Sequence, residues 1–256
     1  MMMKQRVHIQ VYQTSADFEA KAAEEIAGVM HAAIAKRGKC FVALSGGETP
    51  RQIYRQLAED PLKSRVDWNQ VHLFFSDERC VPPTSPESNY GMAETALISS
   101  IDILEKNVHR MKGEIDPIVA AREYEREIRD AFGRQPVRFD LVILGLGEDG
   151  HTASLFTGSP VIGEQHALVC PAPAPNKPMQ RLTLTFPCIN SAREIIFMAS
   201  GKKKARIVQR VLGASRPSNN LPATMVQPVD GKLTWLIEKD AASLIQPGDE
   251  SKARLS

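Results

Sequence analysis

The sequence predicts an α/β protein: a mostly parallel sheet flanked by helices on both faces, Rossmann-like and folded as a single domain. Segments with strand patterns and segments with helix patterns alternate along the 256 residues. The central strand candidates are continuous apolar runs, which is typical of parallel strands that are buried on both faces. We find no internal repeat and no clear domain boundary within the chain.

The first strand and the first helix have clear sequence signals. Residues 7–12 alternate in polarity and predict a strand. Residues 14–38 predict a helix that Thr14 or Ser15 can cap and that Gly38 ends. Apolar residues at four-residue spacing mark its buried face: Phe18, Ala22, Ile26, Met30 and Ile34.

Two buried strands follow, at residues 40–45 and 71–76. After the first strand a short helix begins, with Pro50 in its first turn, and stops before Pro61. After the second strand comes a Pro- and Ser-rich loop that contains the charged residues 77–79. A helix from about residue 89 to residue 97 is expected next, before a short extended piece.

The second half begins with a charged amphipathic helix around residues 117–132 and a buried strand at 139–145. Residues 166–170 and 180–186 predict two further strands. We expect residues 171–178, which are rich in proline, to form an extended loop between them.

The chain closes with a strand at 194–200 that leads into a helix at 202–213, and with a last strand at 232–238. We therefore assign one domain to residues 1–245. Residues 246–256 are polar and are expected to form a frayed C-terminal tail.

Composition excludes several classes of function. A net charge of +2 gives no reason to expect a nucleic acid or a membrane surface as partner, although a small anionic ligand remains open. No apolar run approaches the roughly 20 residues of a membrane span, and the start of the chain does not read as a secretory signal. Cys40, Cys80, Cys170 and Cys188 show no paired spacing and are expected to be reduced thiols, so we expect a cytoplasmic location. The sequence does not indicate an oligomeric state.

Residues 145–150 spell G-x-G-x-x-G, the dinucleotide-binding pattern, directly after a strand. That pattern requires a full helix after the loop, and an acidic residue at the end of the next strand. Here Gly158 and Pro160 interrupt the chain after less than two turns, and the next strand candidate ends in prolines. We therefore expect no nicotinamide or flavin cofactor.

The same loop delivers Asp149 and His151 to the carboxyl end of a parallel strand, where such sheets bind ligands. Histidine exchanges protons near neutral pH, so His151 is a candidate general base. The alternative is a structural loop histidine, but its placement beside glycines at a binding edge favours chemistry. Asp149 either orients the imidazole or shapes the turn.

The other parallel strands should bring their loops to the same edge. Ser45, Gly46, Gly47 and Thr49 precede a helix and are typical of an anion cradle, although a plain strand–helix turn is the alternative.

Charged residues follow two further strands: Asp77, Glu78 and Arg79 after one, and residues 202–204, all lysines, after the other. For both, a solvated charged loop is the alternative, and two of the three lysines are expected to be simply exposed. No Ser or Cys has a base nearby in the sequence, and no His or Cys spacing indicates a metal, so neither covalent catalysis nor a metal site is predicted.

Taken together, the motifs resemble one family, the 6-phosphogluconolactonases, which are related in fold to the glucosamine-6-phosphate deaminases. The resemblance covers about residues 10–240 and rests on five segments in the family's order: ALSGGETP, FFSDERCVPPTSPESNYGMA, FDLVILGLGEDGHTASLF, RLTLTFP and SGKKKA. It implies hydrolysis of 6-phospho-D-glucono-1,5-lactone to 6-phospho-D-gluconate, in the oxidative pentose phosphate pathway, without a cofactor.

The resemblance also implies roles for individual residues. It makes His151 the catalytic base, with Asp77 and Arg79 as further catalytic or substrate contacts. Arg79 or the amides of residues 145–150 would stabilise the oxyanion. Binding of the substrate and its phosphate is implied for Ser45, Gly46, Gly47, Thr49, Asn89, Gly147, Asp149, Arg181 and Lys204.

The chain departs from the family's pattern at Glu48, where serine is frequent, and at Thr157, where proline is usual. We expect the Glu48 carboxylate to face away from a bound phosphate, and little effect of Thr157. One alternative function is an amino-sugar-phosphate deaminase, but no acid follows His151 within five residues. The other alternative is a non-catalytic sugar-phosphate sensor, which would carry a DNA-binding segment. We expect no such segment here, because the first strand begins by residue 7.

Overall fold

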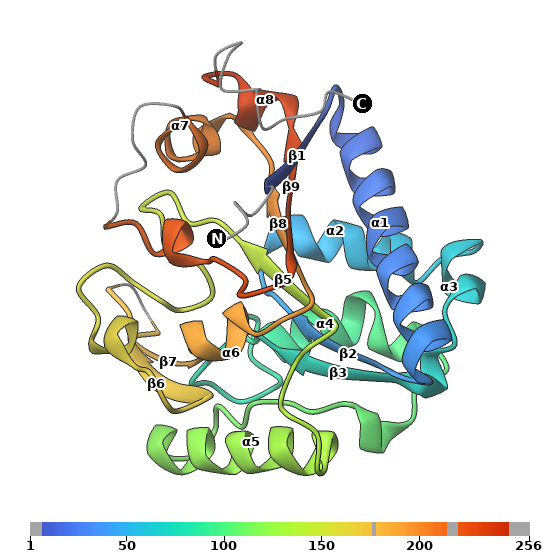
Figure 1. The fold of residues 1–256 in the computed structure, drawn as a ribbon, viewed down its shortest axis with the longest axis vertical. Coiled ribbons are helices and arrows are strands. Elements are labelled where there is room, and N and C mark those ends of the chain that lie inside the picture. Colours follow the sequence, from blue (N-terminus) through green and yellow to red (C-terminus); the bar gives the residue numbers. More distant parts are fainter. Residues whose placement is uncertain (1–6, 176–177, 214–219, 246–256) are drawn as a thin grey trace.

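The computed structural model describes residues 7–175, 178–213 and 220–245. Its centre is a six-stranded sheet in the order β1-β9-β8-β5-β2-β3, in which every neighbouring pair is parallel (Figure 1). The expected mostly parallel sheet is therefore confirmed. The strands are β1 (Val7–Tyr12), β2 (Cys40–Leu44), β3 (Val71–Phe75), β5 (Leu141–Gly145), β8 (Glu194–Ala199) and β9 (Lys232–Glu238).

Helices cover both faces of this sheet, as the sequence predicts. One face packs a buried cluster against α1 (Ser15–Arg37), α2 (Glu48–Leu57), α3 (Leu62–Arg65) and α4 (Asn89–Ala96). The other face packs against α5 (Pro117–Phe132), α6 (Phe186–Asn190), α7 (Ala205–Leu212) and α8 (Lys239–Ala242). The short helices α3, α6 and α8 were not expected, because a single turn is too short to show a helical period. Among the described residues, no helix has the length and apolar character needed to cross a bilayer.

The ends of α1 follow the expected capping. The Thr14 hydroxyl accepts a hydrogen bond from the Asp17 amide at 3.1 Å, and Gly38 ends the helix with a φ of 76°. A left-handed backbone of this kind favours glycine because a Cβ would crowd the adjacent carbonyl oxygen. The predicted tail at residues 246–256 lies outside the described residues.

A second, antiparallel sheet in the order β4-β7-β6 corrects two expectations. Residues 77–79, expected as a charged loop, form β4 (Asp77–Arg79), which pairs with β7 (Gln180–Leu184). Residues 171–173, expected at the start of the proline-rich loop, belong to β6 (Val169–Pro173). Proline is tolerated there because β6 is an edge strand, so the N–H that proline lacks is not needed for a hydrogen bond to a neighbouring strand.

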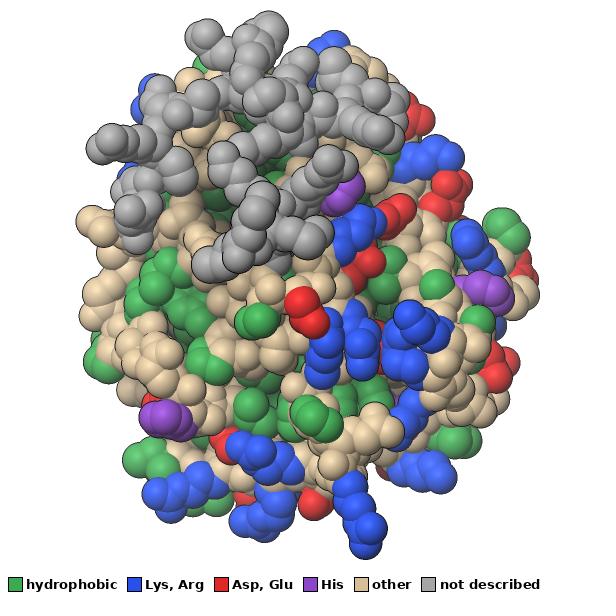
Figure 2. Space-filling model, viewed as in Figure 1, with side chains coloured by type: hydrophobic (Ala, Val, Ile, Leu, Met, Phe, Trp, Pro, Cys, Tyr) green, Lys and Arg blue, Asp and Glu red, His purple; other side chains and the backbone are tan. Residues whose placement is uncertain are grey.

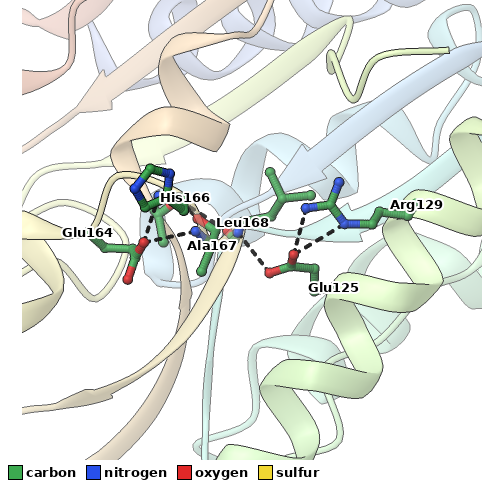
Figure 3. A network of polar contacts seen from close by, with 7 residues as sticks. Glu125, Arg129, Glu164, His166, Ala167 and Leu168 are labelled. Carbon is green, nitrogen blue, oxygen red and sulfur yellow. Dashed lines mark hydrogen bonds and ion pairs between the residues drawn. The ribbon is translucent and has the colours of Figure 1, made fainter.

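Side-chain carboxylates hold the segment before β6 against α5 (Figure 3). Glu125 of α5 pairs with Arg129 at 2.7 Å and accepts a hydrogen bond from the Leu168 amide at 2.8 Å. Glu164 accepts hydrogen bonds from three successive amides, those of residues 165–167. The segment that leads into β6 is thereby tied to α5.

Candidate active site

The carboxyl ends of β2, β5 and β8 meet the small sheet around a cleft of about 380 Å³. The sequence-based expectation that these loops share one edge is confirmed. Every predicted site residue except Asp149 lines the cleft: Ser45, Gly46, Gly47, Thr49, Asp77, Arg79, Asn89, Gly147, His151, Arg181 and Lys204.

His151 and Asp149 form a hydrogen-bonded pair in the loop after β5. One carboxylate oxygen of Asp149 lies 2.5 Å from His151 Nδ1 and also accepts a hydrogen bond from the His151 amide at 3.1 Å. Partial burial alone would raise the pKa of Asp149, but the nearby His151 and its hydrogen bonds together lower that pKa. Because an ionised carboxylate only accepts, the neutral form of the imidazole carries its proton on Nδ1 and its lone pair on Nε2. Asp149 therefore lies just behind the imidazole and orients it.

Gly147 makes this pair possible. A Cβ on Gly147 would lie 2.1 Å from His151 Nδ1 and 2.6 Å from the Asp149 carboxylate. The Gly147 amide also donates to the His151 carbonyl at 2.8 Å, which closes the loop. No helix starts here; the next helical element is a short 3-10 turn, Pro160–Gly163. The glycine pattern thus serves the histidine loop, as the failed dinucleotide context indicates.

Residues of β4 alternate between the cleft and the protein interior. Asp77 and Arg79 line the cleft, whereas Glu78 is 2% exposed and lies at the start of α4. Burial raises the pKa of Glu78, although four hydrogen bonds oppose that rise. Its carboxylate accepts from the amides of Arg79, Asn89 and Tyr90 and from the Ser88 hydroxyl, at 2.7–2.9 Å. Glu78 is thus a helix cap rather than a site residue, a role that only the fold reveals.

Asp77 is held by donors from two other segments. Its carboxylate accepts from Asn89 Nδ2 at 3.2 Å and from the Ser154 hydroxyl at 2.7 Å. Asn89 fits because Gly46 faces it: a Cβ on Gly46 would lie 1.7 Å from the Asn89 side-chain oxygen. Ser154 was not predicted. Its only signal was its place three residues after His151.

Two arginines lie directly opposite each other across the small sheet. Arg79 of β4 and Arg181 of β7 are register partners, and both line the cleft. Like charges in this position are unfavourable unless an anion or solvent compensates them. Burial lowers the pKa of Arg181, and the adjacent Arg79 lowers it further. Other atoms hold the side chains in place: Arg79 Nη1 donates to the Glu87 carbonyl at 2.6 Å and Arg181 Nε to the Pro178 carbonyl at 2.9 Å.

A third cation, Lys204, lines the cleft from the loop after β8. It is half-buried, whereas Lys202 and Lys203 are exposed, as expected for two of the three lysines. Burial lowers the pKa of Lys204, while Glu148 and Asp149 act in the opposite direction.

The loop after β2 has the features of an anion cradle. Gly47 precedes α2 as its N-cap with a φ of 110°, and the Ser45 hydroxyl is buried without a hydrogen-bond partner among the described residues. The Thr49 hydroxyl lies 2.7 Å from that of Ser200, a residue the sequence did not single out, and so joins this loop to the one after β8. Glu48 lines the cleft, and its carboxylate contacts Arg51 and Gln52 of its own helix, so the expectation that it faces away from a bound phosphate stays a prediction.

A family model described as glucosamine-6-phosphate isomerases/6-phosphogluconolactonase matches residues 13–235. The chain belongs to this family. It is 38% identical over 220 residues to a 6-phosphogluconolactonase of Synechocystis, covering 84% of this chain and 88% of that protein. It is 38% identical over 239 residues to human 6-phosphogluconolactonase, covering 88% and 91%.

Solved structures agree in fold. The 6-phosphogluconolactonase of Trypanosoma cruzi superposes with a TM-score of 0.82 at 32% identity, covering 95% of this chain and 97% of that one. The 6-phosphogluconolactonase of Thermotoga maritima superposes with a TM-score of 0.79 at 33% identity, covering 91% of this chain and 100% of that one. A monomeric glucosamine-6-phosphate deaminase gives 0.76 at 23% identity, covering 93% and 99%, and shows the shared fold alone. The single-domain α/β fold predicted from the sequence is confirmed.

Proposed function

We propose that this chain hydrolyses 6-phospho-D-glucono-1,5-lactone to 6-phospho-D-gluconate, a reaction of the oxidative pentose phosphate pathway. The decisive observation is the His151–Asp149 pair: His151 lines a cleft that also holds the cations Arg79, Arg181 and Lys204, and within the described residues its Nε2 makes no hydrogen bond. The 6-phosphogluconolactonases that resemble this chain over most of its length support the same reaction.

The pair suits lactone hydrolysis because the reaction needs one group that first accepts and then returns a proton. Nε2 of His151 takes a proton from water as the water oxygen bonds to C1 of the lactone. The carbonyl becomes an oxyanion, and when it re-forms, the bond from C1 to the ring oxygen breaks. The imidazolium then protonates that ring oxygen. General acid–base catalysis of this kind contributes about 10²–10⁴-fold.

We assign the remaining cleft residues to charge stabilisation. The oxyanion is stabilised either by Arg79, which lies on β4 with Asp77, or by the backbone amides of the Gly147 loop. Arg181, Lys204 and the Ser45–Thr49 cradle hold the substrate phosphate, which carries about −1.5 to −2 charges near neutral pH. Binding of the remote phosphate positions C1 at the histidine, so part of the binding energy lowers the activation free energy of hydrolysis. No cofactor enters these steps.

The deaminase alternative is not favoured. After His151 the chain continues with Thr152, Ala153 and Ser154, and the Ser154 hydroxyl is bound to Asp77. No carboxylate follows within five residues to move further protons, as aminosugar isomerisation would require.

The test is acid release from freshly prepared phosphogluconolactone, followed in a pH-stat against spontaneous hydrolysis. Glucono-1,5-lactone and glucosamine 6-phosphate serve as comparison substrates. We expect fast hydrolysis of the phosphorylated lactone, much slower hydrolysis of the other lactone, and no ammonia from the aminosugar. Ammonia release, or no acceleration over buffer, would refute the proposal.

A further inference from the structure

A second cavity, of about 280 Å³, lies at the opposite edge of the central sheet, where β2, β5 and β8 begin. It shares no lining residue with the active-site cleft. Its charged lining comes from four segments: Arg37 ends α1, Lys39 precedes β2, Arg138 and Asp140 precede β5, and Arg193 precedes β8.

The single carboxylate among the described lining residues, that of Asp140, forms ion pairs with two arginines. Asp140 is 3% exposed; one oxygen accepts from the Phe41 amide at 2.9 Å, and the other lies 2.7 Å from Arg37 Nε and 3.3 Å from Arg193 Nε. Four cations line the cavity beside this one acid: Arg37, Lys39, Arg138 and Arg193. Asp230 pairs with Arg138 at 2.5 Å, so four positive charges stand against two negative ones.

Hydrogen-bond donors remain available here. Within the described parts of the chain, the Nη groups of Arg37 and Arg193 show no hydrogen bond or ion pair. In the same described ranges, Arg138 Nε is buried without a hydrogen-bond partner, and Lys39 Nζ lies over the Phe41 ring, 4.7 Å from its centroid, without an ion pair. The face drawn in Figure 2 shows Lys and Arg side chains gathered near its centre, over the region where β5 and β8 begin in Figure 1.

We propose that this cavity is a second anion site, which binds a phosphate group. Guanidinium groups match phosphate oxygens in pairs, and an excess of positive charge favours a divalent oxyanion over chloride. An adjoining groove of about 970 Å³ shares Arg37, Arg138, Asp140 and Arg193 with the cavity. It also carries five further carboxylates, so it suits the uncharged part of a phosphate ester and not a second phosphate: Asp17, Glu24, Glu25, Glu194 and Asp230. Free phosphate and a phosphate monoester therefore share the chemistry that this site recognises.

The test uses calorimetric titration in a chloride-free buffer with two probes, inorganic phosphate and glycerol 3-phosphate. The double variant Arg181→Gln/Lys204→Gln serves as background, because it weakens phosphate binding in the active-site cleft. We expect one saturable site to remain in this background. Tighter binding of glycerol 3-phosphate identifies an ester as the ligand, whereas equal binding identifies free phosphate.

Lys39→Gln and Arg193→Gln, added singly to this background, should each weaken binding about tenfold, the effect of one charge-assisted hydrogen bond. Among the described residues, Lys39→Gln breaks no ion pair and loses only the contact with the Phe41 ring, and Arg193→Gln leaves Asp140 paired with Arg37, so both should change the melting temperature of the background little. Arg129→Gln, which removes a charge on α5, is the matched control and should bind as the background does. Absence of saturable binding, or binding that neither substitution weakens, would overturn the proposal.

Discussion

At the level of single residues, the proposed proton-transfer group and the proposed anion-binding groups come from different segments of the chain. His151 follows the carboxyl end of β5, and Asp149 of the same loop fixes its ring. Arg181 lines the cleft from β7 and Lys204 from the loop after β8. Substrate affinity and turnover should therefore respond to different substitutions.

Arg181→Ala and Lys204→Ala should each raise KM for phosphogluconolactone by about tenfold or more, as expected for a lost charge-assisted hydrogen bond. Neither should change hydrolysis of glucono-1,5-lactone, which has no phosphate. Steady-state kinetics on both lactones provide the measurement, with Lys203→Ala, an exposed neighbour, as the control. Equal losses on the two substrates would place these cations at the reacting carbon instead.

Product binding should weaken at alkaline pH earlier than an ordinary lysine would allow. Burial lowers the pKa of Lys204, so this side chain loses its charge at a lower pH than an exposed lysine does. The phosphate is fully charged well above its second pKa of about 6, so a fall in affinity at alkaline pH reflects loss of charge on the protein and not on the ligand. Titrating 6-phosphogluconate by calorimetry at rising pH measures it. Lys204→Arg should remove the alkaline fall, and the same fall in that variant would mean another group titrates.

The grouping of several site residues could be predicted because parallel strands bring their carboxyl-end loops to one edge. This topology places Ser45, His151 and Lys204 together. The roles of Glu78 and Ser154 could not be predicted. Each depends on contacts with a segment distant in the sequence, and Glu78 points inward only because β4 pairs with β7, which comes much later in the chain.

At the level of elements, two backbone features control the site: the tight loop after β5 and the start of α4. In the first, Gly147 leaves space for the His151 ring. In the second, Glu78 satisfies amide donors that would otherwise be buried without partners. Substitutions in the loop after β5 should therefore change kcat, whereas substitutions at the start of α4 should change the free energy of unfolding.

Gly147→Ala should lower kcat by about 10²-fold, because its Cβ would displace the His151–Asp149 pair and a misplacement of about 1 Å can cost that much. Gly163→Ala is the matched control, since nothing lies within 4 Å of the Cβ it would add. Thermal unfolding of both variants distinguishes a displaced loop from a general loss of structure. A Gly147→Ala enzyme with wild-type kcat would mean that the ring position is not critical.

Glu78→Ala should destabilise the protein by about 3 kcal/mol or more, because several buried donors lose their acceptor at a cost of about 1–3 kcal/mol each. Urea unfolding measures the change in the free energy of unfolding.

The control for this substitution is Glu87→Ala. Glu87 directly precedes Ser88, the residue that caps α4, and the contact it makes to Arg79 uses its backbone carbonyl. Its side chain is exposed, so removing that carboxylate should change the free energy of unfolding little. Similar losses in the Glu78 and Glu87 variants would show that negative charge near the helix start, and not hydrogen bonding to the buried donors, is responsible.

At the level of the whole molecule, the order of strands and helices was predictable because buried parallel strands are continuous apolar runs separated by amphipathic helices. The small sheet was not predictable in the same way. Its strands are short, two of its residues are prolines, and β4 consists of three charged residues that only pairing with β7 makes extended. The consequence is functional, since this sheet brings Arg79 and Arg181 to the cleft.

The most direct test of the role of His151 is kcat for His151→Ala with freshly prepared phosphogluconolactone, alongside calorimetric binding of 6-phosphogluconate. A general base acts mainly in the transition state, so kcat should fall by at least about 10²-fold while the Kd of the product stays close to that of the wild type. A variant that retains near-normal kcat would contradict the proposed mechanism and remove His151 from it.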